Sequence, residues 1–309
     1  MTFKLPAKPT AGAAAHELAD LAELMAWANK AVSAREILAL LGRESENDGN
    51  EGCEDDDDRN ADAFGEVADE FERRQQACAG RYPFTLDEVG SVLRHTPVND
   101  LSSWLYGYLL LSTRLNMTHA RNHAGIDGTT LLEDVSAIGL RHYLGPNRAQ
   151  AMVFGTSAGT TGFPARVTQL CRDLGEGFSF KNHHNLPMNA KDDKLDVVAW
   201  LPFADQKASK VIVFGQCKTG TAWTEELCRL HPVDFIKKWV ETPLVFDPLR
   251  AYCVSEAVSR SRWAGYAIEG GLLFDRCRLV DCCDEMEAPL YNRLVKWSRA
   301  ALRSARVDL

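Results

Sequence analysis

The sequence predicts an α/β or α+β fold in which a helical N-terminal region precedes a mixed β-sheet core flanked by helices. Up to Gly175 the apolar residues recur mostly at helical spacing. After Gly175 they form short β-branched runs with a period of two, and helical stretches separate the later runs. This alternation is typical of a small sheet covered by helices.

Size and composition indicate a soluble globular protein. The 309 residues can bury a large core, and 45% apolar with 25% charged residues is an ordinary globular balance. No apolar run approaches the roughly 18 residues of a membrane span. The N-terminus also lacks the apolar segment of a secretory signal. We therefore expect a cytoplasmic protein with no membrane partner.

The nine cysteines are scattered without CxxC pairs, which favours reduced thiols in a reducing compartment. Cys277, Cys282 and Cys283 lie close together, but their spacing is not that of a zinc finger or ribbon. We expect them to be structural.

Acidic charge is concentrated in one segment. Nine acidic residues and one basic residue lie between residues 44 and 60, and their charge of −8 equals the formal net charge of the chain. The rest of the chain is close to neutral, so the total charge does not exclude a nucleic-acid partner. We interpret 44–60 as a disordered acidic linker, and an electrostatic mask for a basic surface is the alternative.

This linker divides the chain. We expect N-terminal helices over 1–43, the linker over 44–60, a helical region over 61–125 and a folded domain over 126–309. In the first three parts the patterns predict helices over 11–31, 34–42, 61–78, 81–95 and 100–115. In the last part they predict helices over 127–145, 162–177, 224–230, 233–241 and 285–309, and strands over 151–156, 194–203, 210–218, 249–256 and 271–280.

The segment "GTSAGTTGFPAR" (155–166) resembles the phosphate-binding loop of acyl-adenylating enzymes, which is rich in Ser, Thr and Gly. Ala158 interrupts the run, and Ala165 stands where that family has a lysine. We interpret the segment as a loop before a helix, and a remote ATP site is the alternative.

A second pattern lies in the predicted hairpin 194–218. Asp196 follows "KL" and precedes an apolar strand, and Gln216 and Lys218 share one face at the end of the next strand, "VIVFGQCK". A carboxylate among apolar neighbours is costly to bury unless it is paired or binds a metal. Taken singly, each residue has an ordinary interpretation as a strand-end polar group, but a hairpin would bring all three to one end of the sheet.

This arrangement resembles the restriction-endonuclease-like (PD-(D/E)xK) nuclease superfamily, and especially its Mrr-like branch, in which Gln often replaces the second acid. The matching residues are Asp196, Gln216 and Lys218, and the resemblance covers roughly residues 130–260. It implies an α-β-β-β-α-β core, and it makes 126–309 the nuclease domain. It also implies an upstream helical Glu that completes the metal site. Glu133 and Glu176 are the two candidates, and we favour Glu133 because it lies within a helical pattern.

The resemblance implies a DNA-cleaving enzyme that uses Mg²⁺ or Mn²⁺. Asp196, Gln216 and Glu133 would hold the metal, which prefers oxygen ligands. Lys218 would orient the attacking water or stabilise the charge of the transition state. Because an amide lacks the charge of an acid, we expect weaker metal binding than in a site with a second acid.

The C-terminal helix carries basic residues at spacings of three and four, which predicts a weak DNA contact. A solvated helix face explains them almost as well. These residues are Arg293, Lys296, Arg299, Arg303 and Arg306. In "KNHHN", His183 and His184 would point in opposite directions on a strand, so we expect at most one of them near the site.

The family resemblance extends to bacterial restriction or antiphage defence. The helical half over 1–125 would then bind a companion subunit, sense a trigger or form a homo-oligomer. The alternative is a catalytically silent module with the same fold that binds nucleic acid or a protein partner.

Overall fold

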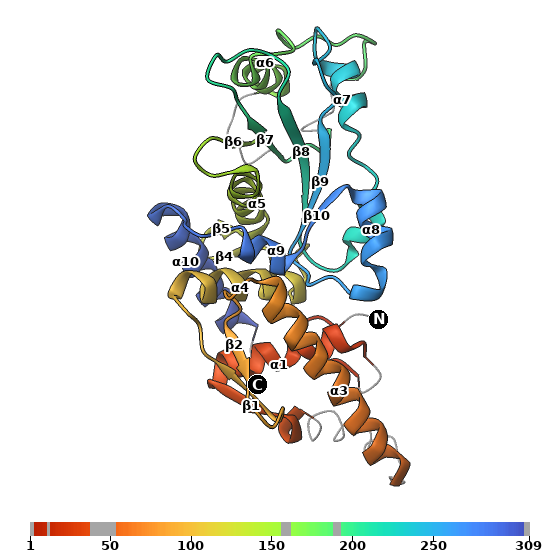
Figure 1. Ribbon diagram of the computed structural model, residues 1–309, viewed down its shortest axis with the longest axis vertical. Helices are drawn as coiled ribbons and strands as arrows, with labels where there is room; N and C mark the ends of the chain where they lie inside the picture. The colour runs from red at the N-terminus through yellow and green to blue at the C-terminus, as the bar shows by residue number, and fades with distance from the viewer. Residues whose placement is uncertain (1–2, 11–12, 38–53, 156–161, 188–192, 306–309) are drawn as a thin grey trace.

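Figure 1 shows the computed structural model of the chain, with the small N-terminal sheet toward one end and the largest sheet toward the other. The structure describes residues 3–10, 13–37, 54–155, 162–187 and 193–305, and over 54–64 it describes the backbone alone. None of the helices in these ranges combines the length and the apolar character that a membrane span requires. The mixed α/β fold class predicted from the sequence is confirmed.

The N-terminal part packs helices around a three-stranded antiparallel sheet with strand order β1-β3-β2. The central helix α4 is buried along almost its whole length, as its run of Leu and Tyr residues predicts. The elements are α1 (Ala15–Asn29), β1 (Ala31–Ser33), α3 (Glu54–Ala77), β2 (Phe84–Leu86), β3 (Val92–His95) and α4 (Asp100–Arg114).

The helix expected over 81–95 is wrong, because this segment forms the antiparallel pair β2 and β3. The Asp87 carboxylate accepts hydrogen bonds from the backbone N–H groups of Ser91 and Val92, at 2.6 and 3.1 Å. Gly90 has a φ of 74°, which glycine adopts without strain. Turn chemistry therefore prevails over the helical pattern here.

The helix expected over 61–78 begins earlier, at Glu54, so the acidic run 55–58 belongs to α3 and not to a linker. Negative charges near a helix N-terminus are favoured by the helix dipole, which offers a physical reason for the earlier start. Most of the predicted linker, residues 44–53, lies outside the described residues, as does 38–42 of the helix expected over 34–42.

The largest sheet has five strands in the order β10-β9-β8-β7-β6. Strands β6, β7 and β8 pair antiparallel, whereas β9 and β10 continue the sheet in parallel. Their bounds are β6 (Gln150–Val153), β7 (Val197–Leu201), β8 (Val211–Lys218), β9 (Leu249–Val254) and β10 (Leu272–Phe274).

Helices cover both faces of this sheet (Figure 1). On one face α5 (Gly128–Leu144) packs on Val197, Ala199 and Val213. On the other face α6 (Phe163–Leu174) and α7 (Pro232–Trp239) pack on Val198 and Phe214. The alternation of β7 and β8 thus supplies apolar side chains to two cores, as expected for strands buried on both faces.

Short elements complete the chain. The strand expected over 271–280 ends at Phe274, because Asp275 caps a new helix by accepting a hydrogen bond from the Arg278 backbone N–H at 3.0 Å. The remaining elements are β4 (Asn122–His123), β5 (Ile126–Asp127), η3 (Ala222–Glu226), η4 (Arg260–Arg262), α8 (Trp263–Gly270), α9 (Arg276–Asp281) and α10 (Ala288–Ser304).

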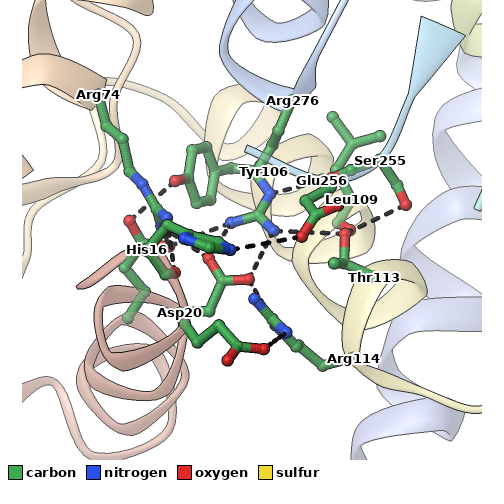
Figure 2. Close-up of polar contacts among 12 residues, drawn as sticks. His16, Asp20, Arg74, Tyr106, Leu109, Thr113, Arg114, Ser255, Glu256 and Arg276 are labelled. Atoms are coloured by element: carbon green, nitrogen blue, oxygen red, sulfur yellow. Dashed lines mark hydrogen bonds and ion pairs between the residues drawn. The ribbon is translucent and has the colours of Figure 1, made fainter. Parts of the chain in front are cut away.

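A buried ion cluster fastens the N-terminal helices to α9 (Figure 2). Asp20 on α1 accepts hydrogen bonds from Arg74 on α3, Arg114 on α4 and Arg276 on α9, at 2.7, 2.7 and 2.8 Å. Although burial favours the neutral acid, the three arginines hold the pKa of Asp20 well below its usual range. Four helices far apart in the sequence therefore meet around one carboxylate.

Candidate active site

The candidate site lies where strands β7 and β8 approach α5. Along the chain, α5, β6, β7, β8, α7 and β9 give the order helix, three antiparallel strands, helix and parallel strand, with α6 inserted between β6 and β7. Because β7 and β8 are antiparallel, the start of β7 and the end of β8 lie at the same edge of the sheet.

The register of these strands brings Asp196 beside Gln216. Val197 pairs with Gly215, so the preceding Asp196 lies opposite Gln216, and the Asp196 backbone N–H donates to the Gly215 carbonyl at 3.0 Å. The Asp196 side chain accepts a hydrogen bond from the Cys217 backbone N–H at 2.7 Å. The carboxylate is thereby oriented along the end of β8.

Gln216 is a buried amide at this edge, with 1% of its surface exposed. Among the described residues, neither its Oε1 nor its Nε2 has a hydrogen-bond partner. A buried polar group left unpaired costs about 1–3 kcal/mol, so it calls for a physical explanation such as an unseen ligand. The amide oxygen can serve as a neutral metal ligand.

Lys218 ends β8, and its ammonium is paired with an acid that the sequence patterns did not single out. Its Nζ lies 2.8 Å from Oε2 of Glu226, which belongs to η3. The hydrogen bond from Lys218 is the main reason why the pKa of Glu226 lies below its usual value. Glu226 follows Lys218 by eight residues in a polar segment, and no motif marked it.

Glu133 reaches the same edge from α5. A Cβ added at Gly155 would stand 2.8 Å from Oε2 of Glu133, so this carboxylate lies against the Gly155 backbone. The Gly155 N–H in turn donates to the Asp196 carbonyl at 2.9 Å. Gly155 therefore contacts both acids, and its missing side chain makes room for Glu133.

Glu176, the other candidate for the upstream acid, is engaged elsewhere. It is buried just after α6, where its two oxygens accept hydrogen bonds from the backbone N–H groups of Ser209 and Val245, at 3.0 and 3.1 Å. This carboxylate orders loops at the far side of α6. Of the two candidates, the structure brings Glu133 to the site.

A cavity of about 450 Å³ joins these side chains. Glu133, Asp196 and Lys218 line it together with Arg121, and Gln216 lies next to it without lining it. The remaining lining residues are Lys4, Met117, Thr118, Thr129, Leu132, Cys217, Thr219, Gly220, Thr221 and Ala222. Nine of these fourteen lining residues are polar or charged, and the three cations Lys4, Arg121 and Lys218 suit an anionic ligand.

The metal ligands expected from the sequence are all oxygen donors. No group of three His, Cys, Asp or Glu side chains close enough to hold a metal occurs among the described residues. The expected set combines the acids Glu133 and Asp196, which line the cavity, with the amide of Gln216, which is buried beside it. Oxygen ligands of this kind suit Mg²⁺ or Mn²⁺, which keep several waters when they bind to proteins.

The cations of α10 lie on a different surface. Arg293 is paired with Asp134 at 3.0 Å, whereas the guanidinium of Arg299 lies 5.0 Å from the centre of the Trp104 ring. Lys296, Arg299 and Arg303 line one hollow of about 410 Å³, and none of the three lines the cavity at Asp196. Arg306 lies outside the described residues.

The sequence also singled out the loop 155–166 and the pair His183 and His184. Most of the loop 155–166 that resembles a phosphate-binding loop, residues 156–161, lies outside the described residues. His183 is hydrogen-bonded through Nε2 to the Val240 carbonyl at 2.9 Å, and its neighbour His184 does not line the cavity at Asp196.

The chain matches no model of a known protein family, and no curated protein or solved structure matches it.

Proposed function

We propose that this protein is a metal-dependent nuclease of the restriction-endonuclease-like type that hydrolyses phosphodiester bonds of DNA. One observation carries the proposal. Glu133, Asp196 and Lys218 line one cavity beside Gln216, at the end of a helix-strand-strand-strand-helix-strand core.

The chemistry follows from the residues present. Asp196 and Glu133 supply the charged oxygen ligands, and Gln216 supplies a neutral one. A divalent cation, when bound, polarises the scissile phosphate and lowers the pKa of a bound water. Lys218 lines the same cavity and donates hydrogen bonds to the attacking water or to the phosphate oxygens as negative charge develops. Arg121, on the same cavity wall, attracts the nucleic-acid backbone.

The family resemblance suggests a biological role in bacterial restriction or antiphage defence. A nuclease of this type fits a bacterial defence effector that meets foreign DNA in the cytoplasm. The N-terminal helices, tied to α9 by the buried ion cluster, would carry a companion subunit or the contact of a homo-oligomer.

A silent binding module is the second candidate, and one observation favours it. The Lys218 ammonium is already paired with Glu226, and an amide replaces the second acid. In a silent module no metal would be needed, and DNA or a protein partner would bind the basic wall of the cavity.

Two measurements test the proposal. Purified protein is incubated with supercoiled plasmid, linear DNA and RNA in Mg²⁺ or Mn²⁺, and cleavage of DNA is the expected result. Calorimetric titration with Mn²⁺ should show binding that Asp196→Ala abolishes. Metal binding unchanged by Asp196→Ala, together with no cleavage of any polymer, would contradict the nuclease and leave the silent module.

A further inference from the structure

Three cations converge on one carboxylate beside the candidate site. Oε2 of Glu226 lies 2.8 Å from Nζ of Lys218 and 3.8 Å from Nζ of Lys194. Its other oxygen, Oε1, lies 3.6 Å from Nη1 of Arg229. The cations come from three places, the turn before β7, the end of β8 and the segment after η3. The sequence separates them by up to 35 residues, so only the fold brings them together.

The cations of this cluster outnumber the carboxylate that they share. The Glu226 side chain is 27% exposed, and its lowered pKa keeps it ionised at neutral pH. Three cations and one carboxylate carry a formal charge of +2. The neighbouring Asp193 is paired with Lys238 and hydrogen-bonded to the Trp239 indole. Asp196 and Glu133 line the adjacent cavity.

The backbone before β7 also fixes the position of Lys194. Asp193 and Lys194 have φ values of 48° and 71°, which is the left-handed region that residues other than glycine rarely adopt. Two such residues in succession turn the chain sharply just before Asp196. Strained backbone of this kind concentrates at functional sites, where the surrounding structure maintains it.

We propose that Lys194, Lys218 and Arg229 form a binding subsite for one backbone phosphate of a nucleic acid, and that the Glu226 carboxylate occupies this subsite in the free protein. The proposal rests on the proposed function for the identity of the ligand, because it places a second phosphate next to the scissile one. A carboxylate and a phosphate offer the same acceptor oxygens to Arg and Lys, and a phosphate makes more hydrogen bonds with this set.

Substrate binding then exchanges one anion for another. The η3 turn itself is anchored, since the Trp223 indole N–H donates to the buried Glu256 at 2.5 Å. The Glu226 side chain is therefore the part that moves when a phosphate enters. An acid at this position also lowers affinity for polyanions that cannot displace it.

The test compares two adjacent acids on the same turn. Glu226→Gln removes the carboxylate from the subsite, and Glu225→Gln makes the same change of charge at an exposed neighbour. Binding of a fluorescein-labelled 20-base-pair DNA duplex is measured by anisotropy in EDTA, without divalent metal and over a range of salt concentrations. Glu226→Gln should bind about tenfold more tightly than Glu225→Gln at low salt, and its salt dependence should be steeper by about one phosphate contact.

A double-mutant cycle identifies the cations involved. Arg229→Gln alone should weaken DNA binding. Added to Glu226→Gln, it should remove most of the gain in DNA affinity, because fewer cations then remain to bind the phosphate. Glu226→Ala should reproduce the gain of Glu226→Gln. Equal affinities for Glu226→Gln and Glu225→Gln, weaker binding by Glu226→Gln, a gain that survives Arg229→Gln, or no DNA binding by any variant would each overturn the subsite.

The outcome is separable from that of the proposed function. The binding assay contains no divalent metal and needs no cleavage. A gain specific to Glu226→Gln in a protein that never cuts DNA would uphold the subsite and contradict the nuclease. DNA cleavage without that specific gain would uphold the nuclease and overturn the subsite.

Discussion

The indole N–H of Trp223 donates a hydrogen bond to the Glu256 carboxylate at 2.5 Å, joining the turn after β8 to the buried ion cluster. His16 on α1 approaches the same carboxylate, with 3.8 Å between Nε2 and Oε1. Glu256 thus links α1 to the η3 turn, and this turn carries Glu226, the partner of Lys218. Figure 2 shows it beside Arg276 and Thr113.

Glu256→Gln should make stability less dependent on pH. Burial raises the pKa of Glu256 from its usual 4.5 to about 7. The folded protein therefore holds this proton more tightly than the unfolded chain, so the resulting stability is complete below pH 4.5 and is lost as the pH rises through about 7. A glutamine cannot ionise and avoids this loss.

Urea unfolding of both proteins at pH 5 and pH 8 measures the effect. Between pH 5 and pH 8 the free energy of unfolding of the wild type should fall by up to about 3 kcal/mol more than that of Glu256→Gln. The pKa of His16 is lowered mainly by burial, which the substitution leaves in place. Glu88→Gln, at an exposed acid, is the control, and an identical pH dependence of wild type and Glu256→Gln would contradict the assignment.

Asp20→Asn should destabilise the whole fold. The change removes the charge shared by Arg74, Arg114 and Arg276, all three of them fully buried. Breaking a buried ion pair typically costs about 3–5 kcal/mol, because the remaining charge stays without compensation. Thermal and urea unfolding would measure the loss. Asp281→Asn, which breaks a partly exposed pair with Arg81, should cost less than about 1 kcal/mol.

Gly155→Ala should weaken metal binding more than it weakens the fold. The new methyl group would stand 2.8 Å from Oε2 of Glu133, so this flexible side chain must move from its position at the cavity. Calorimetry should show about a tenfold higher dissociation constant for Mn²⁺, because Glu133 would no longer be held in position to bind the metal. Gly265→Ala places its methyl group in open space and should leave metal binding unchanged.

Charge reversal on α10 tests the weak DNA contact. Changing Lys296, Arg299 and Arg303 to Glu should reduce DNA affinity and flatten its salt dependence, because each cation that meets a phosphate releases a counterion. Metal-free anisotropy measures both effects. Arg299 also contacts the Trp104 ring, so the variant loses an Arg–Trp contact as well as charge. Arg278→Glu, which removes the contact of Arg278 with Trp263, is the control for that loss. Unchanged affinity in the triple variant would remove α10 from the DNA-binding surface.

Local patterns predicted the sheet and the strand-end residues. The β-branched runs around Val198 and Val213 mark β7 and β8, and their antiparallel pairing brings Asp196 to Gln216 as the hairpin pattern predicts. The wrong predictions fall where short polar side chains decide the backbone. Asp87 closes the β2–β3 turn, and Asp275 begins α9, each by a side-chain hydrogen bond that periodicity does not reveal.

The charged contacts could not be predicted from the sequence. Asp20 and Arg74 lie in two predicted helices and Arg276 in a predicted strand, and only tertiary packing shows that they meet. The same holds for Glu226, whose three cations are distributed over 35 residues. Long-range ion pairs leave no periodic signal, so these contacts become visible only in the folded chain.

The most direct test of the account is cleavage of supercoiled plasmid by the wild type, Asp196→Asn and Lys218→Ala in Mg²⁺ and Mn²⁺, with Lys207→Ala as an exposed control. The account predicts metal-dependent cleavage by the wild type and the control, and a loss of at least about a hundredfold in the two site variants. Equal cleavage by all four proteins, or cleavage that persists in EDTA, would contradict a metal-dependent nuclease at this site.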